Sequence, residues 1–189
     1  APRRRWRVRG VNGSRRMMKP PCVPGQVPST SLLLVTMTFH EFTAGGCMLP
    51  RLDCNSKDKA IERLVQALAA DGVVGDEQAL LKDILTRESV GDTAVGHGVA
   101  IPHVRSAHVK VPRLAVGTLV TPVPHRGTDG LEVDVLFLIV GPDGDPRTML
   151  RLLARVVRYV RETGFLSCLR AATTAEELLA CFADSDPQD

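Results

Sequence analysis

Apolar residues with helical spacing mark a first helix between Ser56 and Gly72. The spacing is i, i+1, i+4, i+5 and i+8, which places these residues on one face of a helix. Ser56 can cap its N-terminus, and Gly72 can end it. The residues expected on the buried face are Ala60, Ile61, Leu64, Val65 and Leu68.

A second helix is predicted to begin near Asp76, a residue type that suits the N-cap position. It extends to Arg87 and Glu88. Arg87 would therefore leave this helix facing the segment at residues 96–103. The residues expected on its apolar side are Ala79, Leu80, Ile84 and Leu85.

Short apolar runs indicate strands. Residues 48–54 suit a short strand, in which Pro50 marks an edge or a first strand position. Residues 114–120 and 133–140 predict two more strands. The second of these is almost wholly apolar, as expected for a strand that is covered on both faces. This pattern indicates layers on both sides of a sheet.

Residues 99–101 form another apolar run, which indicates a buried strand. Pro102 ends it, because proline has no N–H for the next ladder hydrogen bond. His103 is therefore expected at a strand end.

Residues 147–161 predict an amphipathic helix. The arginines on its outer face suit an acidic partner. A solvated face is the better interpretation, because charged residues must lie opposite any apolar stripe. The buried face is expected to hold Leu150, Leu153, Val156, Val157 and Val160, and the outer face Arg147, Arg151, Arg155 and Arg158.

Residues 173–176 (T-T-A-E) predict a capping box that opens the last helix. The inner face of this helix is expected to hold Leu178, Leu179 and Phe182. Strands thus alternate with helices along the chain, and no internal repeat is present. This order indicates an α/β layered fold.

The segment G-H-G-V-A-I-P-H at residues 96–103 carries most of the candidate chemistry. Its glycines let the backbone approach a ligand closely. A neutral imidazole is a good nucleophile near pH 7, and a phosphorylated imidazole is a good leaving group. His103 is therefore a candidate nucleophile toward phosphorus.

Residues 98–103 resemble the phosphorylation segment of enzyme IIA (EIIA) domains of the sugar phosphotransferase system (PTS), in the fructose/mannitol and nitrogen-regulatory class. The segments L-T-R-E and G-D-T-A-V-G precede it, at residues 85–88 and 91–96. Two further matches are D-G at 129–130 and L-R-A-A at 169–172. Six matched residues with flanking agreement are far more specific than a lone short motif. The resemblance covers roughly residues 37–182.

The resemblance implies an α/β fold with a mixed sheet of about five strands, flanked by helices on both faces. It also implies a phosphocarrier, in which His103 accepts a phosphoryl group from a histidine carrier protein. His103 would then pass the group to a IIB component, or hold it as a signal to a regulated target protein. In this family the arginine at the position of Arg87 binds the phosphate, and a planar guanidinium can bind two oxygens at once. Thr93, Gly96 and Gly98 would support the phosphate site, with no cofactor and no metal ion expected.

Four residues depart from the family pattern. Met149 stands where related domains usually place a second active-site histidine, and Asp92 would repel a phosphoryl group. Ala94 replaces a usual glycine, and Val104 follows His103 where glycine is frequent. These differences leave a second function open, a regulatory protein-binding module of the nitrogen-regulatory type with impaired phosphotransfer.

The remaining histidines are weaker candidates. His97, His108 and His125 are expected to be surface side chains. A metal site of His97, His103 and His108 is disfavoured, because metal sites show closer spacing or an accompanying carboxylate motif. No strong nucleotide-binding fingerprint is present, which argues against a kinase that uses ATP directly.

Charge divides the chain near residue 36. Residues 1–36 hold eight Lys and Arg and no Asp or Glu, which leaves 16 basic and 21 acidic residues after them. The resemblance also places the usual start of the domain near Met37. We therefore expect a disordered basic extension at 1–36, a domain at 37–184 and a tail at 185–189. The alternative, an arginine-rich arm for nucleic acid or an anionic membrane, is less favoured, and no nucleic-acid partner is expected.

The five cysteines are odd in number and form no C-x-x-C pair, so that neither a disulfide framework nor a zinc site is indicated. This cysteine usage favours a reducing cytoplasm. The longest apolar stretch of the N-terminal part, residues 32–35, is much shorter than the ~20 residues of a membrane span. No transmembrane helix is expected.

Overall fold

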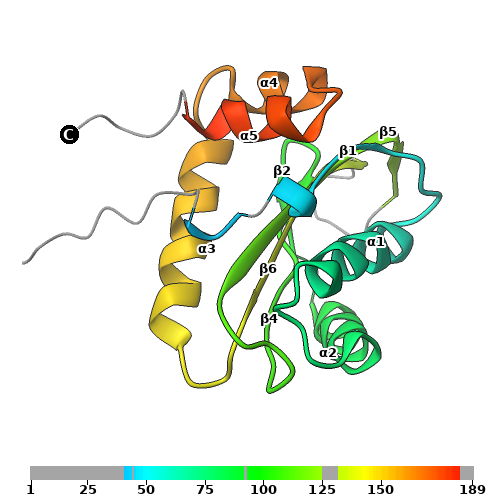
Figure 1. The fold of residues 1–189 in the computed structure, drawn as a ribbon. Coiled ribbons are helices and arrows are strands. Elements are labelled where there is room, and N and C mark those ends of the chain that lie inside the picture. Colours follow the sequence, from blue (N-terminus) through cyan, green and yellow to red (C-terminus); the bar gives the residue numbers. More distant parts are fainter. Residues whose placement is uncertain (1–40, 44, 92, 125–131, 184–189) are drawn as a thin grey trace, which may run out of the picture. The chain divides into compact units, whose positions relative to one another are not determined.

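The computed structural model describes residues 41–43, 45–91, 93–124 and 132–183 (Figure 1). All of them belong to one compact unit, Met37–Asp189. The expected basic extension at 1–36 and the tail at 185–189 lie outside the described residues, as do Asp92 and His125.

A mixed sheet of six strands forms the centre of this unit. The strand order is β1-β5-β6-β3-β2, and β4 also pairs with β6. β5 and β6 are antiparallel, whereas β3 and β4 run parallel to β6. The strands are β1 (Met48–Leu52), β2 (Ala94–Gly96), β3 (Val99–Ala100), β4 (His103–Arg105), β5 (Arg113–Val123) and β6 (Val133–Gly141). The predicted mixed sheet is confirmed, with one strand more because the chain is interrupted at residues 101–102.

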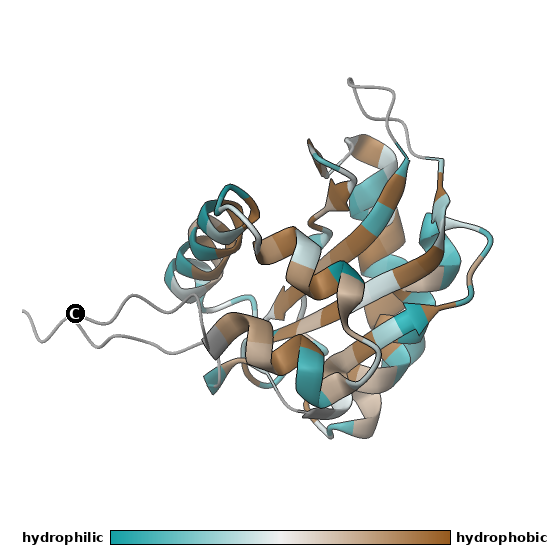
Figure 2. Cartoon of the chain, turned by 90° about the horizontal axis from the view of Figure 1, so that it is seen from above, coloured by the Kyte–Doolittle hydropathy of each residue, from teal (hydrophilic) through white to brown (hydrophobic). Residues whose placement is uncertain are grey.

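Helices cover both faces of the sheet (Figure 1). One face carries α1 (Lys57–Ala70) and α2 (Glu77–Val90). The other face carries α3 (Pro146–Val160), α4 (Phe165–Ala171) and α5 (Ala175–Ala183). A short 3-10 helix, η2 (Gly45–Cys47), leads into β1. In Figure 2 the strands between the helices are mostly brown, whereas teal residues gather on the outer sides of the helices.

The first two helices begin as predicted, and α2 continues two residues beyond Glu88, to Val90. The Ser56 side chain accepts a hydrogen bond from the backbone N–H of Lys59, and the Asp76 side chain accepts one from Ala79. Gly72, with φ of +79°, follows the end of α1. All five residues predicted for the inner face of α1 are buried. Local capping and periodicity were therefore sufficient to predict these elements.

The predicted buried face of α3 was wrong at one position. Val156 and Val160 are buried, and Leu153 and Val157 are partly buried and pack against the core. Leu150 is 67% exposed. The buried side chains are Met149, Leu152, Val156, Tyr159 and Val160. The prediction also left out Tyr159, whose ring packs among aromatic residues of other elements, with ring centroids 5.2 Å from Phe165 and 6.2 Å from Phe182.

The capping box of α5 lies one residue later than predicted. The Thr174 hydroxyl accepts from the backbone N–H of Glu177 at 3.2 Å. The Glu177 carboxylate in turn accepts from the backbone N–H groups of Thr173 at 2.6 Å and Thr174 at 3.3 Å. These hydrogen bonds, led by the one from Thr173, hold the pKa of Glu177 below its usual value.

Cys168 in α4 and Cys181 in α5 form a disulfide, with 5.9 Å between their Cα atoms. The sequence, which indicated no disulfide framework, did not predict this single bridge. The two cysteines are 13 positions apart in the sequence. No local motif joins them; they meet because α4 packs on α5. Within the described residues, no helix is long and apolar enough to cross a membrane.

The turn between β2 and β3 has three consecutive residues with positive φ, namely Gly96 (+88°), His97 (+56°) and Gly98 (+77°). Arg170 of α4 holds this turn: its guanidinium donates to the His97 carbonyl at 2.6 Å and to both carboxylate oxygens of Asp134. A Cβ atom at Gly98 would lie only 2.5 Å from an Asp134 oxygen and 2.9 Å from an Arg170 nitrogen. Gly98 is thus required by both its backbone conformation and the close approach of this ion pair.

We expect Cys168→Ser to lower the free energy of unfolding by about 2–3 kcal/mol under oxidising conditions, because it opens the covalent link between α4 and α5. Urea unfolding monitored by circular dichroism would measure the loss. The control is the same pair of proteins in excess dithiothreitol, where the two curves should coincide. A loss of the same size in dithiothreitol would contradict a role for the disulfide.

We expect Gly98→Ala to cost about 2–4 kcal/mol in unfolding free energy, since it combines a positive φ with a steric overlap. Gly164→Ala is the matched control, because Gly164 has φ of +91° and no atom within 4 Å of an added Cβ. That variant should lose only about 1–2 kcal/mol. Equal losses in urea unfolding would show that the Asp134–Arg170 contact does not restrict position 98.

Candidate functional site

His103 is the first residue of β4, directly after the interruption that follows β3. The sequence predicted that the strand ends at Pro102 and that His103 lies at a strand end. β3 does end before Pro102, and His103 lies at the start of a further strand, β4. The Pro102 carbonyl between them still accepts from the N–H of Ile139 in β6, at 2.9 Å. His103 is paired in register with Ile139 and is half-buried. Pairing with the central strand β6 therefore fixes the backbone position of His103.

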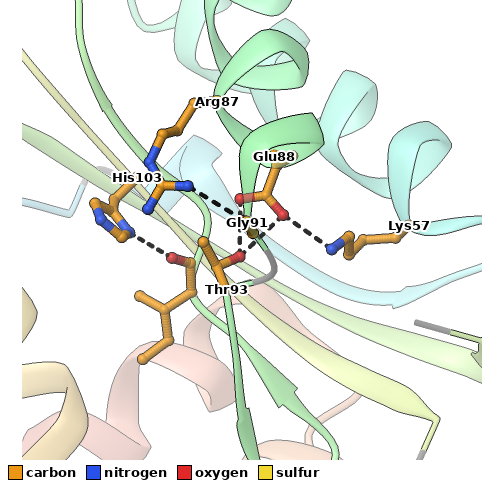
Figure 3. Close-up of polar contacts among 7 residues, drawn as sticks. Lys57, Arg87, Glu88, Gly91, Thr93 and His103 are labelled. Atoms are coloured by element: carbon orange, nitrogen blue, oxygen red, sulfur yellow. Dashed lines mark hydrogen bonds and ion pairs between the residues drawn. The ribbon is translucent and has the colours of Figure 1, made fainter. Parts of the chain in front are cut away.

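The imidazole ring of His103 is held by its own backbone. Its Nδ1 atom lies 2.8 Å from the carbonyl oxygen of Ile101 (Figure 3). A carbonyl oxygen can only accept, so Nδ1 is the atom that carries hydrogen in this contact. In the neutral ring the lone pair then lies on Nε2.

Arg87 lies in the last turn of α2, as predicted. One of its terminal nitrogens donates to the carbonyl of Gly91 at 3.2 Å, a contact that suits a cation at a helix C-terminus. This contact uses one of the five N–H donors of the guanidinium. Figure 3 shows the Arg87 side chain extending toward the His103 ring.

Thr93 connects α2 to the segment that carries His103. Its hydroxyl donates to the Glu88 carboxylate, at 2.9 and 3.0 Å from the two oxygens. Its backbone carbonyl accepts from the N–H of Ile101 at 2.9 Å. Thr93 is buried, and its hydroxyl hydrogen is engaged by Glu88. Thr93 thus links Glu88 of α2 to Ile101, the residue whose carbonyl orients the imidazole.

Glu88 also forms an ion pair with Lys57, at 2.9 Å between Nζ and Oε2. Both side chains are largely buried, with exposed fractions of 5% for Glu88 and 13% for Lys57. Sequence reasoning did not identify this pair, because its members are 31 residues apart and share no periodic pattern. A weak signal was available, since Lys57 is a cation at the start of a helix, where cations are disfavoured.

Gly96 and Gly98 are not brought to His103. The Gly98 carbonyl accepts from the N–H of Asp134, whereas His103 pairs with Ile139 on the same strand. Five residues of an extended strand correspond to about 16 Å. The structure therefore gathers His103, Arg87 and Thr93, and it places the glycine turn at the other end of the β3–β4 segment.

Met149 lies in the apolar core and is 7% exposed. It packs against Gly141, where an added Cβ would come within 2.7 Å of its sulfur. Gly141 pairs with Arg105, at the end of β4. Ala94 has no positive φ, so an alanine causes no backbone strain at this position, where the family usually has a glycine.

The other described histidines lie apart from this group. The His97 side chain is exposed on the glycine turn, and the backbone carbonyl of His108 accepts from Gly75. In the part of the chain that the structure describes, no cluster of three or more His, Cys, Asp or Glu side chains could hold a metal ion.

Two known proteins resemble this chain in sequence over most of its length. The chain is 35% identical to a nitrogen regulatory protein of Bradyrhizobium diazoefficiens over 152 residues, which cover 78% of this chain and 95% of that protein. It is 37% identical over 153 residues to the PTS system 2-O-alpha-mannosyl-D-glycerate-specific EIIABC component of Escherichia coli, covering 80% of this chain but only 22% of that longer protein.

Solved structures of related proteins have the same fold as this chain. Nitrogen regulatory protein IIA-Ntr from Neisseria meningitidis superposes with a TM-score of 0.69 at 25% identity, covering 75% of this chain and 97% of that one. Enzyme IIAMTL of Escherichia coli, solved in complex with phosphorylated enzyme IIBMTL, has the same fold, with a TM-score of 0.64 at 15% identity and coverage of 75% and 97%.

The family model of the phosphoenolpyruvate-dependent sugar phosphotransferase system, EIIA 2, matches residues 42–185. This match confirms the resemblance inferred from the phosphorylation segment. The chain belongs to the EIIA 2 family of the phosphoenolpyruvate-dependent sugar phosphotransferase system.

Proposed function

We propose that Nε2 of His103 accepts a phosphoryl group from a histidine-phosphorylated carrier protein. His103 then passes the group to a IIB-type partner or holds it as a regulatory signal. The observation that carries this proposal is the hydrogen bond from Nδ1 to the Ile101 carbonyl. It selects the tautomer that leaves the Nε2 lone pair free, and it fixes the direction in which that lone pair points.

The transfer needs no proton to move. The Nε2 lone pair forms a bond to phosphorus as the bond between phosphorus and the donor's imidazole nitrogen breaks, and the donor ring leaves neutral. The His103 ring, with hydrogen on Nδ1 and phosphorus on Nε2, becomes positively charged. The Ile101 carbonyl, already 2.8 Å from Nδ1, stabilises that charge as it develops.

Arg87 is proposed to bind the phosphoryl oxygens. Phosphoryl transfer spreads negative charge over three equatorial oxygens, so that fixed donors account for most of the catalysis. The contact between Arg87 and the Gly91 carbonyl holds the guanidinium at the end of α2. Its remaining N–H groups can then meet two phosphoryl oxygens at once.

The donor and the acceptor are proposed to be proteins. Val90, at the end of α2, is 83% exposed, and Val95 in β2 is 44% exposed. Both lie close in sequence to Arg87 or Thr93, and exposed apolar side chains around a polar centre suit a protein interface. The solved complex of a related fold with a phosphorylated IIB protein is consistent with this kind of partner.

We further propose that the functional domain spans residues 37–184, that residues 1–36 are dispensable to it, and that the protein acts in the cytoplasm. The family match at residues 42–185 supports the domain bounds. In a reducing cytoplasm Cys168 and Cys181 would be thiols, and the disulfide would form on oxidation.

One observation favours a second function. Met149 occupies the place at which the family resemblance expects another histidine, and a thioether cannot donate a hydrogen bond to a phosphoryl oxygen. The alternative is therefore a regulatory binding module with impaired phosphotransfer. Relatives named nitrogen regulatory protein are consistent with regulation through phosphorylated His103 and also with regulation by binding alone.

The proposal predicts that phosphoenolpyruvate, enzyme I and the histidine carrier protein together add one phosphate to the intact mass. The phosphate should be labile in acid and stable in base, and ³¹P nuclear magnetic resonance should assign it to Nε2. His103→Ala should abolish the addition, and Arg87→Ala should slow it by ~10²-fold or more. His97→Ala, at an exposed histidine, is the control and should change little. If the wild-type chain accepts no phosphate from cognate carriers, the phosphocarrier proposal fails.

Met149→His separates the two functions. If the missing imidazole limits transfer, this variant should phosphorylate His103 several times faster than the wild type, at the same atom. Met149→Leu is the matched control, because it fills the space over Gly141 without a nitrogen atom. Equal rates for all three proteins, measured by quenched-flow mass spectrometry, would show that position 149 does not limit transfer.

A further inference from the structure

We infer that the outer face of α3 binds an acidic helix of a partner protein. The inference goes beyond the proposed function, because it does not depend on the phosphorylation of His103. In Figure 1 α3 stands at one side of the molecule, and none of the described helices or strands covers its outer side. The exposed residues that form this outer face are Arg147, Leu150, Arg151, Ala154, Arg158 and Arg161.

Charge of one sign is concentrated on this helix. Residues 146–161 hold five arginines and no acidic residue, whereas the rest of the chain after residue 36 holds 11 basic and 21 acidic residues. The nearest acidic residues along the sequence are Asp145 and Glu162, one at each end. Asp145 accepts from the backbone N–H of Thr148, and Glu162 lies 3.8 Å from Arg158. The middle of the outer face is therefore positive in a domain that is otherwise acidic.

This arrangement of charge does not serve the stability of the helix. Arg147 and Arg151 are four residues apart, a spacing at which like charges on a helix repel each other. Arg147 also lies in the first turn, where the helix dipole disfavours a cation. Solubility requires neither feature, since interspersed charges of both signs would serve it as well. A negatively charged partner that covers this face explains why the charges have one sign.

Apolar side chains in the middle of the outer face favour a protein as the partner. Leu150 is 67% exposed, and the exposed Ala154 follows one turn later. A leucine surrounded by arginines is typical of the centre and rim of a protein interface, and a small alanine lets a second helix approach closely.

Two other anionic partners fit the outer face less well. An amphipathic helix binds a membrane through a broad apolar face, but α3 packs its apolar face into the core with β6. Nucleic acid is a polyanion, which the excess of acidic residues in the rest of the domain repels.

The spacing of the arginines suits carboxylates on a helix. Arg147, Arg151 and Arg158 occupy positions i, i+4 and i+11, which lie on one side of a helix over about 16 Å. Glutamates at the same spacing on a second helix form the same pattern, and each guanidinium can bind a carboxylate through two N–H groups.

The probe for this inference is a stapled helical peptide with glutamates at i, i+4, i+7 and i+11 and a leucine beside them. Titration into the ¹⁵N-labelled full chain should shift the amide resonances of residues 147–161. These resonances report binding at α3 itself, although residues 1–36 are also basic. A control peptide with glutamine in place of glutamate should bind about tenfold more weakly or less.

Variants of the chain test the charge and the apolar contact separately. The double variant Arg147→Gln/Arg151→Gln should weaken peptide binding by about threefold to tenfold and should not lower the Tm, since it removes a repulsion. Leu150→Ser should weaken binding by about threefold or more, because an apolar contact is lost. Arg63→Gln is the matched control, at an exposed arginine of α1 on the opposite face of the sheet, and should leave the affinity unchanged.

Three results would overturn the inference. Equal affinities for the two peptides, or an unchanged affinity in Leu150→Ser, would show a solvated face that attracts charge without docking a helix. Phosphatidylglycerol vesicles or duplex DNA that perturb residues 147–161 more strongly than the peptide would identify a different class of partner. A wild-type dimer in sedimentation that the double variant dissociates would identify a second copy of the chain. None of these results bears on His103, because the titration needs no phosphate.

Discussion

The burial of β6 on both faces is the constraint on which the remaining structure depends. Its residues Val135–Val140 are fully buried, and they alternate between the two apolar clusters of the core. A strand with no solvent-facing side must pair along both edges. β5 satisfies one edge, and β3 and β4 together satisfy the other. The most apolar segment of the chain therefore determines where His103 stands.

The candidate site forms at the interruption between β3 and β4, where the backbone groups of residues 101 and 102 point to opposite edges. The carbonyl of Pro102 points toward β6 and completes the ladder there. The N–H and carbonyl of Ile101 point to the other edge, where the N–H meets Thr93 and the carbonyl meets the His103 ring. Among the described residues no strand pairs with Ile101 at this edge, so its carbonyl is available as the acceptor that orients the imidazole.

Sequence reasoning succeeded where the signal was local. The caps of α1 and α2, the apolar run of β6 and the motif around His103 could each be interpreted from a few consecutive residues. It failed where distant segments decide the outcome. The burial of Tyr159 depends on an aromatic cluster with other elements, and the Cys168–Cys181 bond depends on the packing of two helices. The Lys57–Glu88 pair depends on the contact of α1 with α2. None of these partners is encoded by spacing along the chain.

The charges around His103 suit a carrier better than a tight phosphate-binding site. A phosphate held at a helix N-terminus meets several N–H groups and the positive end of the dipole, which favours retention. Here α2 ends at the site with its negative pole, and Arg87 offsets that pole through the Gly91 carbonyl. The Glu88 carboxylate, next to Arg87 in the chain, forms an ion pair with Lys57. These opposing charges suit a carrier, because the site must accept a phosphoryl group and then release it to the next protein.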